Sequence, residues 1–158
     1  MSKEAESAVI SVAEALRSKD EEALLLEIGL RENAIQGNKA LESNPTLQVE
    51  YDSSHMGLID DIKALGRRIM TRWNKELYGV VCGKKAGSGA ETAENKKLRD
   101  DVLNALNFGD AAIIAAVAAA LIALGAPAAI AAPVAPLLVK KFIMPAKDEL
   151  CDAWGEAM

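Results

Sequence analysis

The titratable residues of this chain are few, and they are not spaced for catalysis. His55 is the only histidine, so a histidine metal cluster or a triad with a second histidine cannot be assembled. Asp60 and Asp61 are adjacent, as are Asp100 and Asp101, and neighbouring residues on a helix do not face each other. We therefore expect helix-start or surface charge at these aspartates. No catalytic residue, metal ligand or cofactor is predicted, and the chain is not expected to be an enzyme.

The two cysteines, Cys82 and Cys151, are far apart and lack CxxC spacing, so the sequence indicates neither a disulfide framework nor a zinc site. Cys151 is expected to pack inward with Leu150 and Trp154. Cys82 is expected to be a small apolar residue at a helix end, the alternative being a thiol activated by the lysines that follow it. The default compartment is then intracellular and reducing.

The segment 83–89 reads GKKAGSG, a composition that predicts a flexible linker and a natural site for a hinge or for cleavage. The glycines of this segment are Gly83, Gly87 and Gly89. Glycine amides before a helix can bind phosphate, but here the lysines precede the later glycines, the motif GxxxxGK[ST] is absent, and no strand leads into the segment. A linker is therefore favoured over a phosphate-binding loop.

Two groups of basic residues are candidates for contact with an anionic surface or partner. They are Arg67, Arg68, Arg72, Lys75, Lys140 and Lys141. The alternative for the first four is an ordinary solvated helix face. The formal net charge of −5 argues against a nucleic-acid partner, because dedicated nucleic-acid-binding domains are usually basic.

The segment 111–139 contains no charged or hydrogen-bonding side chain. An apolar run of about 18 residues or more is normally a transmembrane candidate. This run is instead rich in alanine and is interrupted at Gly125, which suits the residue after a helix, and at Pro127, which suits the first residue of the next one. The pattern predicts a hydrophobic helical hairpin over 110–141, with Asp110 capping its first arm.

Pro133 and Pro136 are expected to kink or break the second arm, because each removes a backbone donor. Each arm would be about 20 Å long, short of the roughly 30 Å hydrocarbon core of a bilayer. Constitutive membrane spans are therefore not expected, and Ala116 and Ala119 are expected to be buried in the protein. The residues predicted to form the core or to insert are Ile113, Ile114, Val117, Leu121, Ile122, Leu124, Gly125, Pro127, Ile130, Val134, Leu137 and Leu138.

In architecture, this hairpin resembles the one that colicin-type pore-forming domains hide inside a jacket of amphipathic helices. The resemblance covers only 110–141, is one of pattern, and carries over no functional residue. Basic residues precede the segment at Lys96, Lys97 and Arg99, and its tip is uncharged. This arrangement suits a hairpin that enters a membrane tip first, although charges also resume wherever a buried segment reaches the surface.

The remaining sequence predicts amphipathic helices throughout. Apolar residues recur at helical spacing near Leu16 and Ile28, in two runs that are either separate or one bent helix, with a capping box at Ser18 and Glu21. A long helix from about Ser54 carries an apolar stripe, and further helices are expected over about 90–107 and near the end of the chain. The stripe consists of Leu58, Ile62, Leu65, Ile69, Trp73, Leu77 and Val81.

These features predict a single all-α domain over 1–158: a compact bundle of five to seven amphipathic helices around a central alanine-rich hairpin. The first hypothesis for function is a membrane-active effector, pore-forming or membrane-disrupting, that stays soluble in the cytoplasm until a trigger releases the hairpin to membrane lipids. The alternative is a helical adaptor or regulatory subunit, whose hairpin is core or a protein–protein or self-association interface.

Overall fold

The computed structural model describes residues 3–49, 58–82 and 93–158, and within these ranges the chain forms seven α-helices and no strand. The helices are α1 (Lys3–Leu16), α2 (Glu21–Gly37), α3 (Ile59–Val81), α4 (Ala93–Ala105), α5 (Asp110–Ala123), α6 (Ala128–Leu138) and α7 (Leu150–Ala157). A 3₁₀ turn, η1 (Lys39–Ser43), follows α2, and a π-helical turn, η3 (Val139–Ile143), follows α6. The predicted all-α bundle is confirmed.

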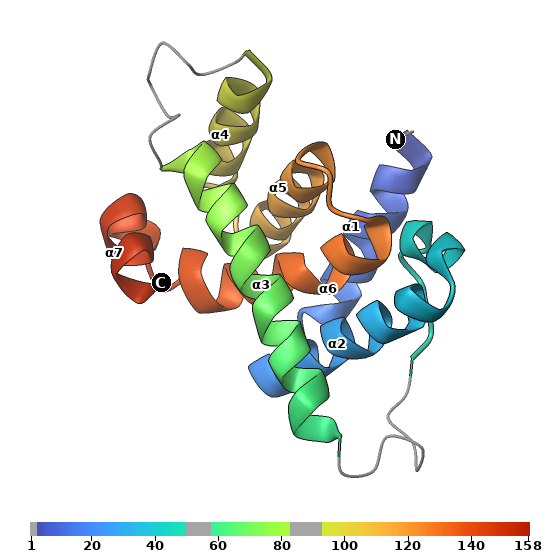
Figure 1. Ribbon diagram of the computed structural model, residues 1–158. Coiled ribbons are helices and arrows are strands. Elements are labelled where there is room, and N and C mark those ends of the chain that lie inside the picture. The colour runs from blue at the N-terminus through green and yellow to red at the C-terminus, as the bar shows by residue number, and fades with distance from the viewer. Residues whose placement is uncertain (1–2, 50–57, 83–92) are drawn as a thin grey trace.

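Helix α6 lies in the middle of the bundle, with α3 crossing in front of it (Figure 1). It contacts α1, α2, α3 and α5, and every residue of the helix is buried. The residues expected near the centre of the fold are all buried, so this prediction is confirmed. They are Ile113, Val117, Leu121, Ile130 and Val134.

Helices α1 and α2 are separate, which excludes the single bent helix. The capping box predicted at Ser18 and Glu21 is wrong, because the N-cap residue of α2 is Asp20 and not Ser18. The Asp20 carboxylate accepts a hydrogen bond of 2.8 Å from the backbone N–H of Ala23. Asp20 satisfies an otherwise unpaired N–H of the first turn and so sets where α2 begins.

Helices α2 and α3 cross with their backbones in contact at two glycines. A Cβ built on Gly29 would lie 2.1 Å from the carbonyl oxygen of Ile62, and one built on Gly66 would lie 2.1 Å from that of Leu25. Any side chain at either position would therefore push the helices apart. This close crossing lets α2 and α3 pack against each other, and both helices contact α6.

The apolar stripe predicted for the long helix is found on α3, although its ends differ. Ile62, Trp73, Leu77 and Val81 are buried, and Leu65 and Ile69 are half-buried. Leu58 is 48% exposed, because it precedes the first turn of α3 and does not lie on the packed face. The start predicted near residue 54 lies outside the described residues.

Candidate functional site: the buried hairpin

The two arms of the hairpin are joined by a tight turn at Gly125. Helix α5 ends at Ala123, and Gly125 has a φ of +104°, a conformation that favours glycine. The N–H of Gly125 donates to the Ile122 carbonyl and the N–H of Ala126 donates to the Leu121 carbonyl, at 3.0 and 2.9 Å. This pair of hydrogen bonds is the Schellman motif, so the expected C′ glycine is confirmed.

Both arms begin one residue away from the predicted position. The N-cap of α5 is Gly109, and Asp110 is the first helical residue. Pro127 is the N-cap of α6 and not its first helical residue. Asp110 still places its negative charge in the first turn of α5, where the helix dipole favours it.

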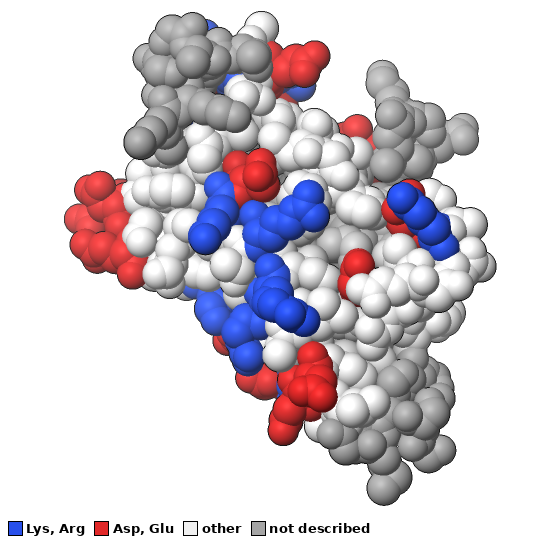
Figure 2. All heavy atoms as spheres, viewed as in Figure 1, with Lys and Arg blue, Asp and Glu red and all other residues white. Residues whose placement is uncertain are grey.

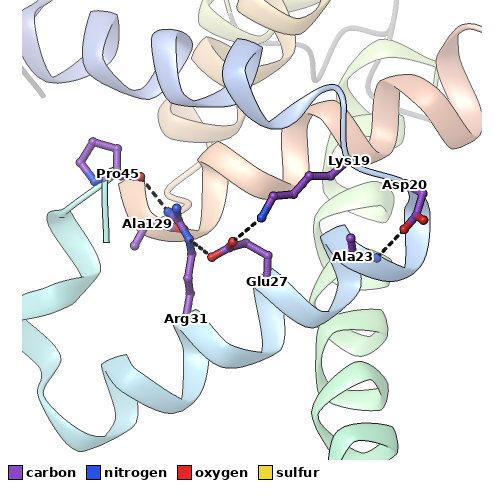
Figure 3. Close-up of polar contacts among 7 residues, drawn as sticks. All are labelled: Lys19, Asp20, Ala23, Glu27, Arg31, Pro45 and Ala129. Carbon is purple, nitrogen blue, oxygen red and sulfur yellow. Dashed lines mark hydrogen bonds and ion pairs between the residues drawn. The ribbon is translucent and has the colours of Figure 1, made fainter. Parts of the chain in front are cut away.

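Pro133 and Pro136 were expected to kink or break the second arm, and a break does not occur, because α6 continues through both prolines to Leu138. Pro133 has no N–H, so the carbonyl of Ala129, four residues earlier, loses its helical donor. The guanidinium of Arg31, on α2, donates a 3.0 Å hydrogen bond from Nη1 to that carbonyl (Figure 3). A donor from another helix thus supplies the hydrogen bond that proline removed.

Arg31 is only 3% exposed, and its charge is compensated by several groups. Its Nη1 also donates to the Pro45 carbonyl at 2.7 Å, and its Nε pairs with Glu27 at 3.0 Å. Glu27 in turn pairs with Lys19 at 3.1 Å (Figure 3). Sequence reasoning missed Arg31, although its position between Ile28 and Ile35 placed a charge on the apolar stripe of α2.

The predicted hairpin residues are buried along both arms and become accessible at the turn. Ile122, Leu124 and Pro127 are half-buried, and Gly125 is exposed. The buried members are Ile113, Ile114, Val117, Leu121, Ile130, Val134, Leu137 and Leu138.

The expectation for two alanines of α5 is wrong. Ala116 and Ala119 are only half-buried, whereas their neighbours Ala118 and Ala120 are fully buried. Helix α5 is apolar on every side, so periodicity could not indicate which side faces α1, α4 and α6 and which faces solvent.

A surface depression of about 600 Å³ opens at the hairpin turn. Its walls combine apolar residues of the turn with Glu6 of α1 and Glu42 of η1. Ala126 is nevertheless only 3% exposed, whereas Ala123, in the last turn of α5, is exposed. The tip therefore reaches the surface without projecting freely from it.

The four basic residues of α3 lie on one exposed face, and blue side chains gather along this helix in Figure 2. We call Arg67, Arg68, Arg72 and Lys75 the α3 basic face. Within the described ranges, none of the four has a carboxylate within 4.0 Å. The guanidinium of Arg72 lies 4.7 Å from the centre of the Trp73 ring, which holds it against the surface.

The lysines that follow the hairpin are engaged elsewhere. Lys141 pairs with Glu21, and Lys140 donates to the backbone carbonyl of Lys19, so both are tied to the start of α2. In α4, Lys97 pairs with Asp101 at 2.9 Å, and this hydrogen bond raises the pKa of the lysine. Lys97, Lys140 and Lys141 are thus less available to an anionic surface than the α3 basic face.

The prediction for the cysteines is wrong, because Cys82 and Cys151 form a disulfide with a Cα–Cα distance of 5.3 Å. They lie 69 residues apart, a separation that carries no local signal of pairing. Cys151 is exposed and does not pack inward, whereas Leu150 and Trp154 are buried as expected.

Two further sets of residues singled out in the sequence fall where the structure gives no description. The linker glycines Gly83, Gly87 and Gly89, and the single histidine His55, lie outside the described residues. In the part of the chain that is described, no group of three or more potential ligand side chains is placed to hold a metal ion. The described helices also include none whose length and apolarity would allow it to cross a bilayer.

No protein-family model, curated protein or solved structure matches this chain. Function is therefore inferred from the hairpin, its jacket and the surface chemistry.

Proposed function

We propose that this chain is a non-enzymatic, membrane-active protein that keeps its hairpin, 110–141, buried until a trigger releases it. The observation that carries the proposal is that α6 is both entirely apolar and entirely buried. Its eleven residues include no polar side chain, and all of them are enclosed by other helices. Most helices of a bundle leave a polar side to water, whereas an all-apolar helix suits either a protein interior or lipid.

The jacket around α6 supports a latent state. Helices α1, α2 and α3 place apolar residues against the hairpin and charged residues outward. Separating them from α6 would expose an apolar surface well above the few hundred Å² that a soluble monomer tolerates. The released hairpin must then enter a membrane, associate with another copy or bind a partner.

The lengths of the arms favour shallow insertion over two complete spans. Helix α5 has 14 residues and α6 has 11, so they are about 21 and 17 Å long, against a hydrocarbon core of about 30 Å. The uncharged turn would enter first, while Asp110, Lys140 and Lys141 remain at the interface.

The α3 basic face would bring the protein to anionic lipid. Each lysine or arginine near an anionic surface contributes about 1 kcal/mol of attraction, weakened by salt. The four exposed cations of the α3 basic face would also suit an acidic protein partner. This face is therefore the observation that favours the alternative function, a helical adaptor.

Leakage of a trapped dye from vesicles of phosphatidylcholine and phosphatidylglycerol tests the proposal. The protein would carry a protease site within 83–89, the segment predicted as a linker, and would be assayed after cleavage with a thiol reductant present. We expect leakage from the cut, reduced protein. Its absence would overturn the membrane function and favour the adaptor, whose hairpin is only core.

A charge at the tip tests which part of the hairpin enters. Ala123→Lys adds a cation at an exposed site in the last turn of α5, where the helix dipole tolerates it. Gln36→Lys, on the exposed end of α2, is the matched control because it adds the same charge outside the hairpin. Burying a lysine in a bilayer costs about 2.5 kcal/mol or more, so Ala123→Lys should slow leakage by at least tenfold. Undiminished leakage would exclude tip-first insertion.

A further inference from the structure

Helix α7 joins the hairpin to its jacket. The chain leaves α6 through η3, and α7 contacts both η3 and α3 (Figure 1). The disulfide from Cys82, at the end of α3, to Cys151, in the first turn of α7, makes the second contact covalent. Helices α4, α5 and α6 all lie inside the loop that this disulfide closes.

Contacts of two aromatic side chains, Trp154 and Tyr78, align α7 on α3. Trp154 is fully buried, and its indole N–H donates to the side-chain oxygen of Asn74 at 2.7 Å. The Tyr78 ring meets the Trp154 ring edge to face, with centroids 5.3 Å apart, and the Tyr78 hydroxyl donates to the Cys151 carbonyl at 3.3 Å. These contacts place Cys151 beside the end of α3, where Cys82 lies.

We infer that the Cys82–Cys151 disulfide is a redox latch that keeps the hairpin buried while it is oxidised and permits release once it is reduced. This inference rests on the proposed function, for which it names a control. With the disulfide intact, the end of α6 stays attached to α3 through η3 and α7. Because α3 is one of the helices from which α6 must separate, this attachment opposes release of the hairpin.

The chemistry needs an external thiol. A thiolate attacks Sγ of Cys151, the exposed partner, the S–S bond breaks, and Cys82 leaves as a thiolate that takes a proton. A second thiol then attacks the mixed disulfide and releases Cys151 as a thiol. Overall, two external thiols are oxidised to one disulfide, and the cystine takes up two electrons and two protons. Low-molecular-weight thiols of a reducing compartment are suitable donors.

The disulfide also changes what a cut within 83–89 can do. That segment lies between Cys82 and Cys151 in the sequence, so a single cut leaves the two fragments covalently joined. Reduction is then required in addition to cleavage before the fragment that carries the hairpin can leave. Two conditions, and not one, therefore control release.

The test compares cut protein with and without a thiol reductant, using the double variant Cys82→Ser, Cys151→Ser as control. Hydrogen exchange at the backbone amides of α6 is the first readout, and it needs no membrane. Reduction should speed this exchange at least tenfold, and the double variant should exchange fast whether or not reductant is present. Dye leakage from the vesicles described above should change in parallel.

The outcomes separate the latch from the proposed function. Exchange in α6 that stays within twofold on reduction, while α7 alone loosens, would overturn the latch even if the protein permeabilises vesicles. Faster exchange in α6 without leakage would support the latch and overturn the membrane function. Reductant-sensitive exchange in the double variant would also count against the latch, since the effect would then arise elsewhere.

Discussion

The crossing of α2 and α3 allows a quantitative test within one helix. Gly66→Ala would place a Cβ 2.1 Å from the Leu25 carbonyl oxygen and 2.9 Å from its carbonyl carbon. Both are backbone atoms of a buried helix, so neither can swing aside. Real contacts of this kind are essentially never shorter than 3.0 Å, so the helices must separate by about 0.9 Å. Gly79→Ala is the matched control, because nothing lies within 4 Å of its Cβ.

The two changes should have opposite signs. Overpacking a well-packed interior costs about 3 kcal/mol when, as here, the neighbour is rigid, and the higher helix propensity of alanine offsets about 1 kcal/mol of that. Gly66→Ala should therefore lower the free energy of unfolding by about 2 kcal/mol, whereas Gly79→Ala should raise it by up to about 1 kcal/mol. For a chain of this size, each kcal/mol shifts Tm by about 2–4 °C.

Thermal and urea unfolding of the oxidised protein, followed by far-ultraviolet circular dichroism, measures both variants. We expect Tm to fall by about 4–8 °C for Gly66→Ala and to rise by about 2–4 °C for Gly79→Ala. Gly29→Ala should resemble Gly66→Ala, and the double variant should cost less than their sum because one separation relieves both contacts. A Gly66→Ala protein as stable as the parent would refute the backbone contact.

Three further changes test the interior. Arg31→Met should lower the free energy of unfolding by about 2–4 kcal/mol in urea titrations, because the Ala129 carbonyl loses its donor; an unchanged midpoint would refute this role. Ala132→Asp should cost several kcal/mol, since it buries an unpaired charge in α6, whereas Ala123→Asp at the exposed tip should cost less than about 1 kcal/mol; equal melting temperatures would contradict the burial of α6. Reducing the disulfide should lower stability by about 4 kcal/mol, from the entropy of its 69-residue loop, and a loss below about 1 kcal/mol would count against a constraining role.

The sequence alone determined the features that depend on neighbouring residues. Helical spacing placed Ile62, Trp73 and Leu77 on the buried side of α3, because residues three and four apart share one face. Gly125 was assigned correctly, because ending a helix there requires a backbone conformation that glycine adopts at little cost. The apolar run over 111–139 was sufficient to predict a hairpin at the centre of the fold.

Only the tertiary structure decided which distant groups meet. Pro133 leaves the Ala129 carbonyl of α6 without a helical donor, and Arg31, almost a hundred residues earlier in the chain, supplies one. The cysteines pair because the Trp154 contacts bring α7 to the end of α3, an arrangement without local signature. The exposed side of α5 was equally hidden, since a helix that is apolar all round has no periodicity to orient it. Each of these outcomes depends on packing between elements, and the pattern within one element does not encode it.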